Sequence, residues 1–256
     1  MPCAIRAWSK CSWVKTMPSD KAAPLLAAAG IESGYGKVRV LWGVDVAVAH
    51  DESAVLLGAN GAGKTTLLKV LMGLIPAWRG RVEFEGGEIT ALRTDLRVRR
   101  GIVYMSETSG FPDLTVDENI RIGAQFLSRS EARQRAEELY SIFPALTERR
   151  RVAAGTLSGG QRKMLGIAKA LASNPKLVIM DEPSAGLSPI LVKEVVNVLA
   201  DLRGKGLSLL IAEQNVKFLD LADRVYTLDG GRIGFSGTVA DMHANDALQR
   251  AYFGLK

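Results

Sequence analysis

The feature that most constrains the fold of this chain is an apolar run that leads into a glycine-rich loop and then into a helical pattern. Residues 54–57 are apolar, Gly58-Ala-Asn-Gly-Ala-Gly-Lys-Thr65 follows directly, and residues 66–72 have the spacing of a helix. Two further apolar runs, residues 176–180 and 207–212, alternate with longer amphipathic stretches. Apolar strands between helices are typical of a parallel sheet that is buried on both faces. The sequence therefore predicts an α/β fold around a mostly parallel sheet.

Local signals place several other elements. Ser188 followed by Pro189 predicts the start of a helix, and Gly204 predicts its end. Near the end of the chain, two short apolar stretches flank Asp229-Gly-Gly231, which predicts a hairpin. The middle of the chain, about residues 101–173, has a charged and alanine-rich character that indicates a helical insert.

The glycine-rich loop matches the phosphate-binding pattern G-x-x-x-x-G-K-[ST], in the strand–loop–helix context that makes such a match informative. Backbone N–H groups of the loop can surround a phosphate, Lys64 can reach the β and γ oxygens, and the Thr65 hydroxyl can bind Mg²⁺. The alternative is a glycine-rich turn that precedes Lys-Thr by chance, and this context argues against it. The predicted nucleotide-binding residues of the loop are Gly58, Ala59, Asn60, Gly61, Ala62, Gly63, Lys64, Thr65 and Thr66.

Two adjacent carboxylates, Asp181 and Glu182, follow the apolar run 176–180. In open α/β sheets, ligands bind beyond the carboxyl ends of the strands, where this pair is expected. Asp181 is predicted to bind Mg²⁺, and Glu182 is predicted to be the general base for an attacking water. A strand end that simply meets solvent is the alternative, and the phosphate-binding loop upstream argues against it.

A second pattern suited to anions, Leu157-Ser-Gly-Gly-Gln161, lies between the loop and the acidic pair. A serine and two glycines at a helix start would present N–H groups and a hydroxyl, whereas a simple helix cap needs neither the glycines nor the glutamine. With the loop and the acidic pair in this order, the chain resembles ABC ATPases over about residues 26–240. The residues expected to contact nucleotide here are Leu157, Ser158, Gly159, Gly160 and Gln161.

The resemblance implies a P-loop NTPase core, an antiparallel β subdomain and a helical subdomain. It also implies ATP and Mg²⁺ as cofactors, and an ATPase in which each ATP lies between the P-loop of one chain and the Ser158 segment of another. Tyr35 stands where the family stacks an aromatic ring on adenine. A tyrosine beside a glycine can also serve only in packing.

Two positions depart from the pattern of most members. Glu107 replaces a glutamine that reaches the metal, and Gln214 replaces the switch histidine of the catalytic site. Together with residues 111–119 and 182–189, they resemble the smaller ATPase subunit of importers for branched-chain, or hydrophobic, amino acids. Importers of urea and short-chain amides are close alternatives. Ser188 also stands where many members have aspartate, so a contact across the dimer cannot be carried over from that residue.

The same resemblance implies partners that this chain does not contain. No apolar run approaches 18 residues, so a membrane role would depend on transmembrane permease subunits. The expected partners also include a second ATPase subunit and, indirectly, an extracytoplasmic solute-binding protein, with this chain at the cytoplasmic face of the membrane. Half of the net charge of +6 lies in the first 24 residues, so the charge gives no reason to expect nucleic acid.

Two rival classes share the phosphate-binding loop. A P-loop kinase has no need of residues 157–161, and ABC proteins that organise DNA insert long coiled coils before that segment. Translation-associated relatives carry two ATPase cassettes in one chain. A single cassette with a short insert favours the transporter subunit.

Residues 1–24 differ from the rest of the chain. They combine Trp8 and Trp13 with four basic residues and three prolines, without periodicity. We expect a disordered N-terminal extension, or a translation start at Met17, followed by an ATPase domain over residues 25–256. A basic segment that lies on a membrane surface is the alternative.

Overall fold

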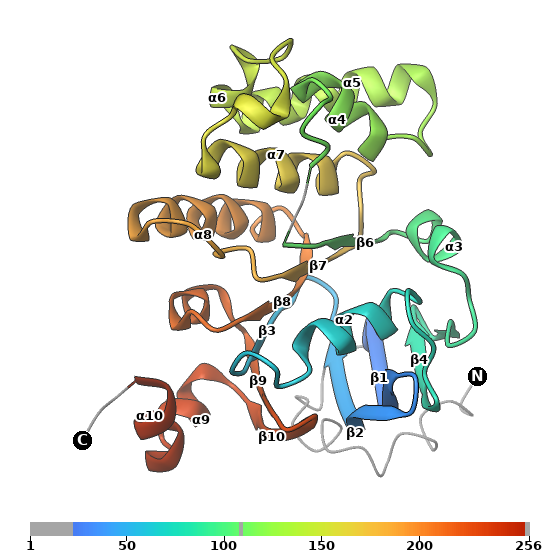
Figure 1. The fold of residues 1–256 in the computed structure, drawn as a ribbon, viewed down its shortest axis with the longest axis vertical. Coiled ribbons are helices and arrows are strands. Elements are labelled where there is room, and N and C mark those ends of the chain that lie inside the picture. Colours follow the sequence, from blue (N-terminus) through green and yellow to red (C-terminus); the bar gives the residue numbers. More distant parts are fainter. Residues whose placement is uncertain (1–22, 108–109, 254–256) are drawn as a thin grey trace.

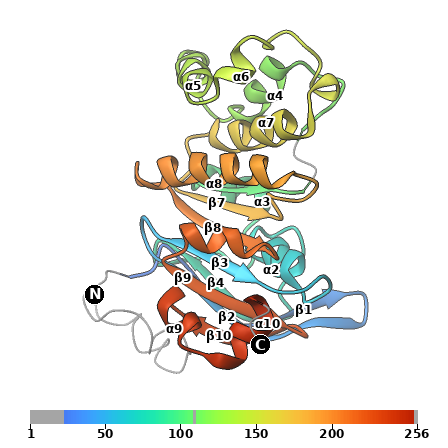
Figure 2. The ribbon, with the colours of Figure 1, turned by 90° about the vertical axis from the view of Figure 1, so that its left-hand side faces the viewer.

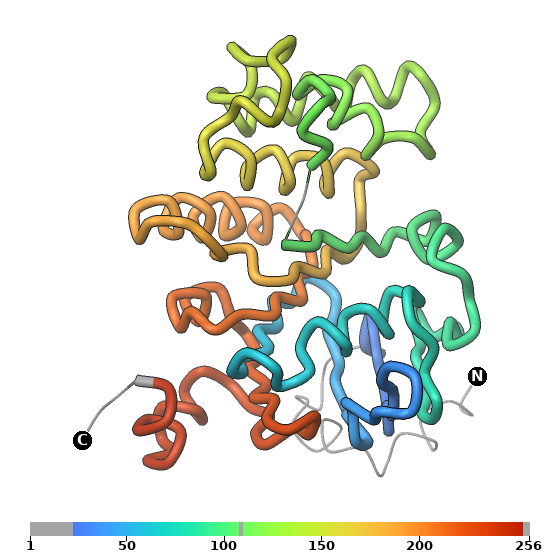
Figure 3. The backbone as a smooth tube through the Cα atoms, viewed as in Figure 1, coloured from blue at the N-terminus to red at the C-terminus, as the bar shows by residue number. Residues whose placement is uncertain are grey.

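The structure, a computed structural model, describes residues 23–107 and 110–253. The predictions for residues 1–22 lie outside this part of the chain. The chain first contributes strands to two sheets, then passes through a group of helices, and afterwards returns to the larger sheet (Figure 3). None of the helices described here combines the length and the hydropathy that crossing a bilayer requires.

The smaller sheet is antiparallel, with the strand order β2-β1-β4-β5. This sheet confirms the antiparallel β part that the resemblance implied. Its strands are β1 (Leu26–Tyr35), β2 (Val38–Val48), β4 (Arg79–Phe84) and β5 (Gly87–Glu88).

The larger sheet has the order β10-β9-β3-β8-β7-β6, and only β10 is antiparallel to its neighbour. The predicted buried strands are confirmed, because every residue of β3, β7 and β8 is buried. The predicted C-terminal hairpin is confirmed by the antiparallel pairing of β9 with β10. The strands are β3 (Ser53–Leu57), β6 (Ile102–Met105), β7 (Leu177–Asp181), β8 (Ser208–Glu213), β9 (Arg224–Asp229) and β10 (Arg232–Gly237).

Helix α2 (Lys64–Leu71) lies against both sheets (Figure 1). Its Leu67 and Leu68 share one apolar core with Val46 of the smaller sheet and Ile179 of the larger sheet. This burial fixes the helix that begins in the phosphate-binding loop. The remaining elements outside the helical group are α3 (Thr94–Arg99), η3 (Val216–Leu221), α9 (Val239–His243) and α10 (Asp246–Phe253).

A group of helices stands at one end of the molecule, beyond the edge of the larger sheet, and α8 (Pro189–Arg203) lies between this group and the rest (Figure 2). Leu139, Leu171 and Val195 belong to a second apolar core, which joins the group to α8 and to the sheet. The helices of the group are α4 (Val116–Gly123), α5 (Arg129–Ile142), α6 (Pro144–Thr147), η2 (Ala154–Thr156) and α7 (Gly159–Leu171).

The helical group is narrower than the predicted insert of residues 101–173. Ile102–Met105 pair in parallel with β7 and form the edge strand β6 of the larger sheet. This stretch is short, and two of its four residues are only half-buried, so its apolar pattern did not separate it from the helices that follow. The helices therefore occupy Val116–Leu171.

Side-chain caps set several helix starts. Ser188 caps α8 by accepting a hydrogen bond from the Leu191 N–H, Pro189 takes the first helical position, and Gly204 follows the last turn, as the sequence predicts. Helix α7 begins with a capping box, in which Ser158 and Gln161 each accept a hydrogen bond from the backbone N–H of the other. Ser158 therefore has a structural role that is independent of any ligand.

Candidate nucleotide site

The phosphate-binding loop connects β3 to α2, as predicted. Gly63 has a φ of 107°, a conformation that favours glycine, and it precedes the first residue of the helix. The loop is anchored at both ends, because the Gly58 N–H donates to the Glu213 carbonyl at 3.3 Å and the Gly231 N–H donates to the Ala62 carbonyl at 3.0 Å. These contacts hold the loop between β8 and the β9–β10 turn.

Lys64 is buried at the centre of this loop, with only 4% of its surface exposed. Its Nζ donates to the carbonyls of Gly58 and Ala59 at 2.9 and 3.2 Å. It also forms an ion pair with Glu182 Oε1 at 3.1 Å. The structure therefore brings the predicted phosphate ligand and the predicted base into direct contact.

Asp181 is the last residue of β7 and is buried. Thr65 Oγ1 donates to its Oδ1 at 3.1 Å, so the two predicted magnesium ligands are adjacent. Tyr104 of β6 donates its hydroxyl to the other carboxylate oxygen at 2.9 Å. Burial, supported by the charge of Asp181, raises the pKa of Tyr104 above its usual value, so the phenol stays protonated and remains a donor.

Glu182 has a φ of 48°, in the left-handed region that residues other than glycine seldom adopt. Such conformations persist where surrounding structure holds them, and they are frequent at functional sites. Gln214 Nε2 donates to Glu182 Oε1 at 3.2 Å and to Asn60 Oδ1 at 2.7 Å. The predicted switch residue therefore connects the predicted base to the phosphate-binding loop.

The Ser158 segment stands apart from this cluster, and the hydrogen bonds of Ser158 stay within residues 158–162. Ser158 and Gly159 are exposed, whereas Leu157 and Gly160 are buried. A Cβ atom on Gly160 would lie 2.7 Å from a methyl carbon of Leu191 in α8, so a larger residue there would displace the Leu191 side chain. Because Ser158 and Gly159 are exposed, the start of α7 is accessible to a ligand or to another chain.

Two predicted residues remain to be placed. Tyr35 ends β1 and is 47% exposed, which leaves its ring face accessible for stacking. Glu107 follows β6 and is exposed, and its carbonyl accepts a hydrogen bond from Lys163 at 3.3 Å. The roles of Tyr35 at adenine and of Glu107 at magnesium stay predictions.

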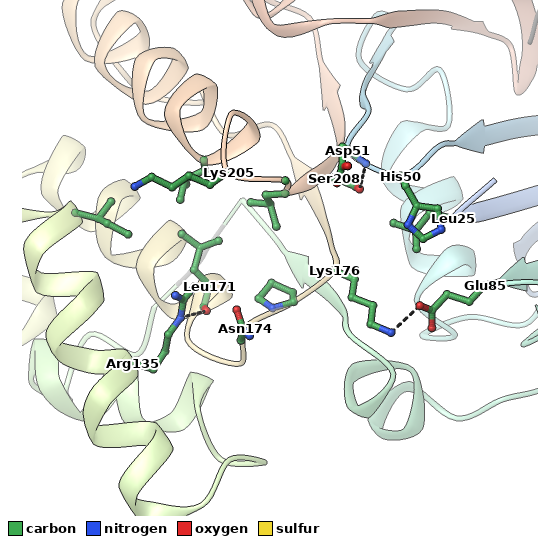
Figure 4. Close-up of a pocket in the computed structure, with 15 residues that line it drawn as sticks. Leu25, His50, Asp51, Glu85, Arg135, Leu171, Asn174, Lys176, Lys205 and Ser208 are labelled. Atoms are coloured by element: carbon green, nitrogen blue, oxygen red, sulfur yellow. Dashed lines mark hydrogen bonds and ion pairs between the residues drawn. The ribbon is translucent and has the colours of Figure 1, made fainter. Parts of the chain in front are cut away.

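A cavity of about 510 Å³ lies at the amino ends of β7 and β8, on the other edge of the sheet from the acidic pair (Figure 4). Lys176 Nζ is paired with Glu85 there at 2.6 Å, and Arg135 Nε donates to the Leu171 carbonyl at 3.1 Å. Of the three lysine and arginine side chains that line this cavity, two are therefore held by protein partners, and the third is Lys205. The cluster around Lys64 is therefore the candidate site.

Comparison with known proteins agrees with this geometry. A family model described as ABC transporter matches residues 41–185. The high-affinity branched-chain amino acid transport ATP-binding protein BraG of Pseudomonas aeruginosa is 39% identical over 226 residues, which cover 88% of this chain and 97% of BraG. The chain belongs to the ABC transporter family. It is the ATPase subunit of a transporter, and ABC ATPase subunits work with transmembrane permease components.

Other relatives of this ABC ATPase are named for two different transport processes. The probable branched-chain amino acid transport ATP-binding protein LivF of Archaeoglobus fulgidus is 35% identical, over 90% of this chain and 99% of LivF. The lipopolysaccharide export system ATP-binding protein LptB of Haemophilus influenzae is 36% identical, over 90% of this chain and 97% of LptB. These relatives share one ATPase family, but their names refer to different transported solutes.

Solved structures match the fold of this ABC ATPase. An ATP-binding cassette of an ABC transporter in its ADP conformation superposes with a TM-score of 0.82 and 29% identity, covering 91% of this chain and all of that chain. A nucleotide-free cassette gives a TM-score of 0.80 with 28% identity, covering 90% of this chain and 99% of that one. The expected fold class and nucleotide binding are both confirmed.

Proposed function

We propose that this ABC ATPase energises the uptake of branched-chain or other hydrophobic amino acids. The observation that carries the proposal is the identity to BraG, which extends over 97% of BraG. The similarity to LivF supports it, as do Glu107 and Gln214, which resemble the smaller ATPase subunit of such importers. The similarity to LptB makes lipopolysaccharide export the second candidate. Uptake of urea or short-chain amides is a further alternative.

In the proposed reaction, the oxygen of a water molecule bonds to the γ-phosphorus of ATP, the bond from that phosphorus to the β–γ bridging oxygen breaks, and ADP leaves. The loop and Lys64 bind the phosphates, because inward N–H groups and a buried cation favour the charge there. Glu182 takes the proton of the attacking water, and Gln214 orients the Glu182 carboxylate through their 3.2 Å contact. Tyr35 stacks on the adenine.

The donor set fits Mg²⁺. The hydroxyl of Thr65 and the carboxylate of Asp181 are adjacent hard oxygen ligands, and P-loop enzymes complete the magnesium shell with phosphate and water. Thr65 and Asp181 would hold the ion, and it would neutralise charge on the phosphates. Glu107 is the further proposed ligand.

The proposed assembly contains a second ATPase chain. The exposed first turn of α7, with Ser158 and Gly159, would contact the γ-phosphate held by the P-loop of that chain. Permease subunits would hold both ATPases at the cytoplasmic face of the membrane, and a solute-binding protein outside would deliver the solute. Each ATP would then lie between two different chains.

The test is transport by the complex that copurifies with this chain. Vesicles that contain the purified complex and its solute-binding protein should take up labelled leucine when ATP is supplied, and a Glu182→Gln complex should not. Excess unlabelled urea or acetamide should leave that uptake unchanged. Uptake of urea or an amide in place of leucine, or recovery of the chain with ribosomes, would overturn the proposal.

A further inference from the structure

Lys163 is a buried cation that the proposed reaction does not use. It lies on α7, two residues beyond the Ser158–Gln161 capping box, and only 6% of its surface is exposed. Its Nζ donates to two backbone carbonyls, that of Glu107 at 3.3 Å and that of Glu182 at 3.4 Å. One side chain therefore connects α7 to the segment that follows β6 and to the segment that follows β7.

The contact at Glu182 is made to its backbone, which is in an uncommon conformation. The Glu182 N–H donates to the carbonyl of Ala212 in β8 at 2.9 Å. Its carbonyl accepts from the Ala185 N–H at 3.1 Å and from Lys163 Nζ at 3.4 Å, so Lys163 is the contact that adds α7 to the local turn. Both peptide groups of the left-handed Glu182 are therefore held by other elements. Because φ and ψ set the direction of the Cα–Cβ bond, these contacts fix the point from which the side chain extends to its carboxylate.

Glu213 holds the adjacent backbone in the same region. It is only 2% exposed, and its carboxylate accepts hydrogen bonds from the N–H groups of Ser184, Gln214 and Asn215 at 2.7, 3.0 and 3.2 Å. The loop that follows Glu182 and the loop that carries Gln214 are thus joined through one buried carboxylate. Lys163 is the contact of this network with α7.

The electrostatic surroundings suit a charged Lys163. Burial lowers its pKa, and the negative charges of nearby carboxylates act in the opposite direction. A buried ammonium group is stable only when opposite charges and acceptors surround it, and here both are present. The four acidic residues that act on Lys163 are Glu107, Glu213, Glu182 and Asp181.

We propose that Lys163 is a positioning residue for ATP hydrolysis, which fixes the backbone of Glu182 relative to α7 and thereby aims its carboxylate at the attacking water. The proposal rests on the proposed role of Glu182 as the base. It assigns Lys163 no contact with nucleotide, so its loss should lower kcat and leave the affinity for ATP unchanged. Misplacement by about 1 Å can cost on the order of 10²-fold in rate.

The experiment compares Lys163→Met and Lys163→Arg with the wild type. ATP affinity is measured on the full chain, and kcat and KM are measured on the copurified transporter complex. Lys163→Met should lower kcat about 10- to 100-fold at unchanged KM. Lys163→Arg should restore most of the rate, since a guanidinium group can donate to both carbonyls.

Lys169→Met is the matched control. Lys169 lies on the same helix, burial also lowers its pKa, and its Nζ lies 4.8 Å from the centre of the Phe111 ring instead of on the catalytic loops. The kcat of the Lys169→Met complex should equal that of the wild type. If Lys163→Met does not fold, Lys163→Gln replaces it, because the amide keeps a donor but is too short to join both carbonyls. The same fall in kcat is then expected.

Three outcomes would overturn the proposal. They are a wild-type kcat in Lys163→Met, a parallel loss of ATP affinity, or a failure of Lys163→Arg to recover the rate although it folds. A Glu182→Gln complex measured beside these variants separates this proposal from the one beneath it. If the Glu182→Gln complex still hydrolyses ATP, Glu182 is not the base. If the Glu182→Gln complex is inactive while Lys163→Met hydrolyses ATP at the wild-type rate, only the role of Lys163 is refuted.

Discussion

Glu182 is the residue on which the proposed chemistry depends. Its carboxylate contacts Lys64 and Gln214, whereas the carbonyl and N–H contacts of the phosphate-binding loop do not involve it. We expect Glu182→Gln to bind ATP as tightly as the wild type and to lose about 10²- to 10⁴-fold in turnover, which is the usual contribution of a general base. In the copurified transporter, the ATP-bound form in which this chain is paired with the second ATPase chain should accumulate.

Turnover, ATP binding and the size of the ATP-bound species measure this prediction. Glu148→Gln, at an exposed position on the helical group, is the control and should behave as the wild type. Near-normal turnover in Glu182→Gln would remove this residue from the chemistry.

Gln214 cannot gain or lose a proton near neutral pH, so the switch position should add no inflection to the pH profile. Gln214→His introduces a group with an ordinary pKa of about 6.5 beside Glu182. Below that pH, the imidazolium would pair with the carboxylate and weaken it as a base, so turnover of the variant should fall as pH decreases. The measurement is kcat from pH 5.5 to 8.5 for both proteins, and identical profiles would contradict the prediction.

At the scale of single residues, sequence patterns located the loop and the acidic pair. In the structure, Lys64 forms an ion pair with Glu182, and Thr65 donates a hydrogen bond to Asp181. Tyr104 and Lys163 were not predicted. Their contacts depend on the parallel register of β6 with β7 and on the packing of α7 against two loops, neither of which leaves a local pattern. A tyrosine in a strand and a lysine in a helix are otherwise unremarkable.

At the scale of elements, Arg97 of α3 holds the end of α2 in place. It is 1% exposed, and its guanidinium group donates to five backbone carbonyls, two at the end of α2 and three in the segment before α3. Burial lowers its pKa to about 10, so it stays charged near neutral pH. This role could not be predicted from the sequence, because residues 93–100 contain four arginines with similar neighbours.

We expect Arg97→Met to lower the free energy of unfolding by about 3–5 kcal/mol, since it leaves buried carbonyls without donors. Arg93→Met is the matched control. Arg93 is 81% exposed and pairs with Asp95 at the surface, so its change should stay within about 0.5 kcal/mol. Chemical denaturation of the full chain measures both values, and equal stabilities would contradict the assigned role of Arg97.

At the scale of the whole molecule, the parallel core was predictable because its strands are short, apolar and fully buried. The smaller sheet was expected only from the resemblance. Its long strands β1 and β2 contain register shifts, and their burial changes irregularly along the chain, so no alternating pattern marks them. The edge strand β6 was missed because it is short and two of its four residues are only half-buried.

The last prediction concerns the second ATPase chain. The P-loop and the exposed start of α7 form separate parts of this chain. Each proposed ATP site therefore combines the P-loop of one subunit, which contains Lys64 in this chain, with the segment of the other subunit that corresponds to Ser158. Gln214 differs from the usual histidine, so the working dimer should pair this chain with a histidine-bearing relative and contain two unequal sites. Ser158→Arg should then block the site whose P-loop lies in the partner, and Lys64→Ala should block the site formed by this chain's own loop.

Each variant therefore abolishes a different share of ATP hydrolysis in the copurified transporter, and the double variant abolishes both. The chain alone, made as Glu182→Gln and saturated with ATP, should remain mostly monomeric by size, because a homodimer would place Gln214 in both sites. Arg133→Ala, at an exposed place on α5 far along the chain from both segments, controls for loss of surface charge. A tight homodimer that drives transport without any other ATPase chain would refute the paired arrangement, since both of its sites would then be chemically identical.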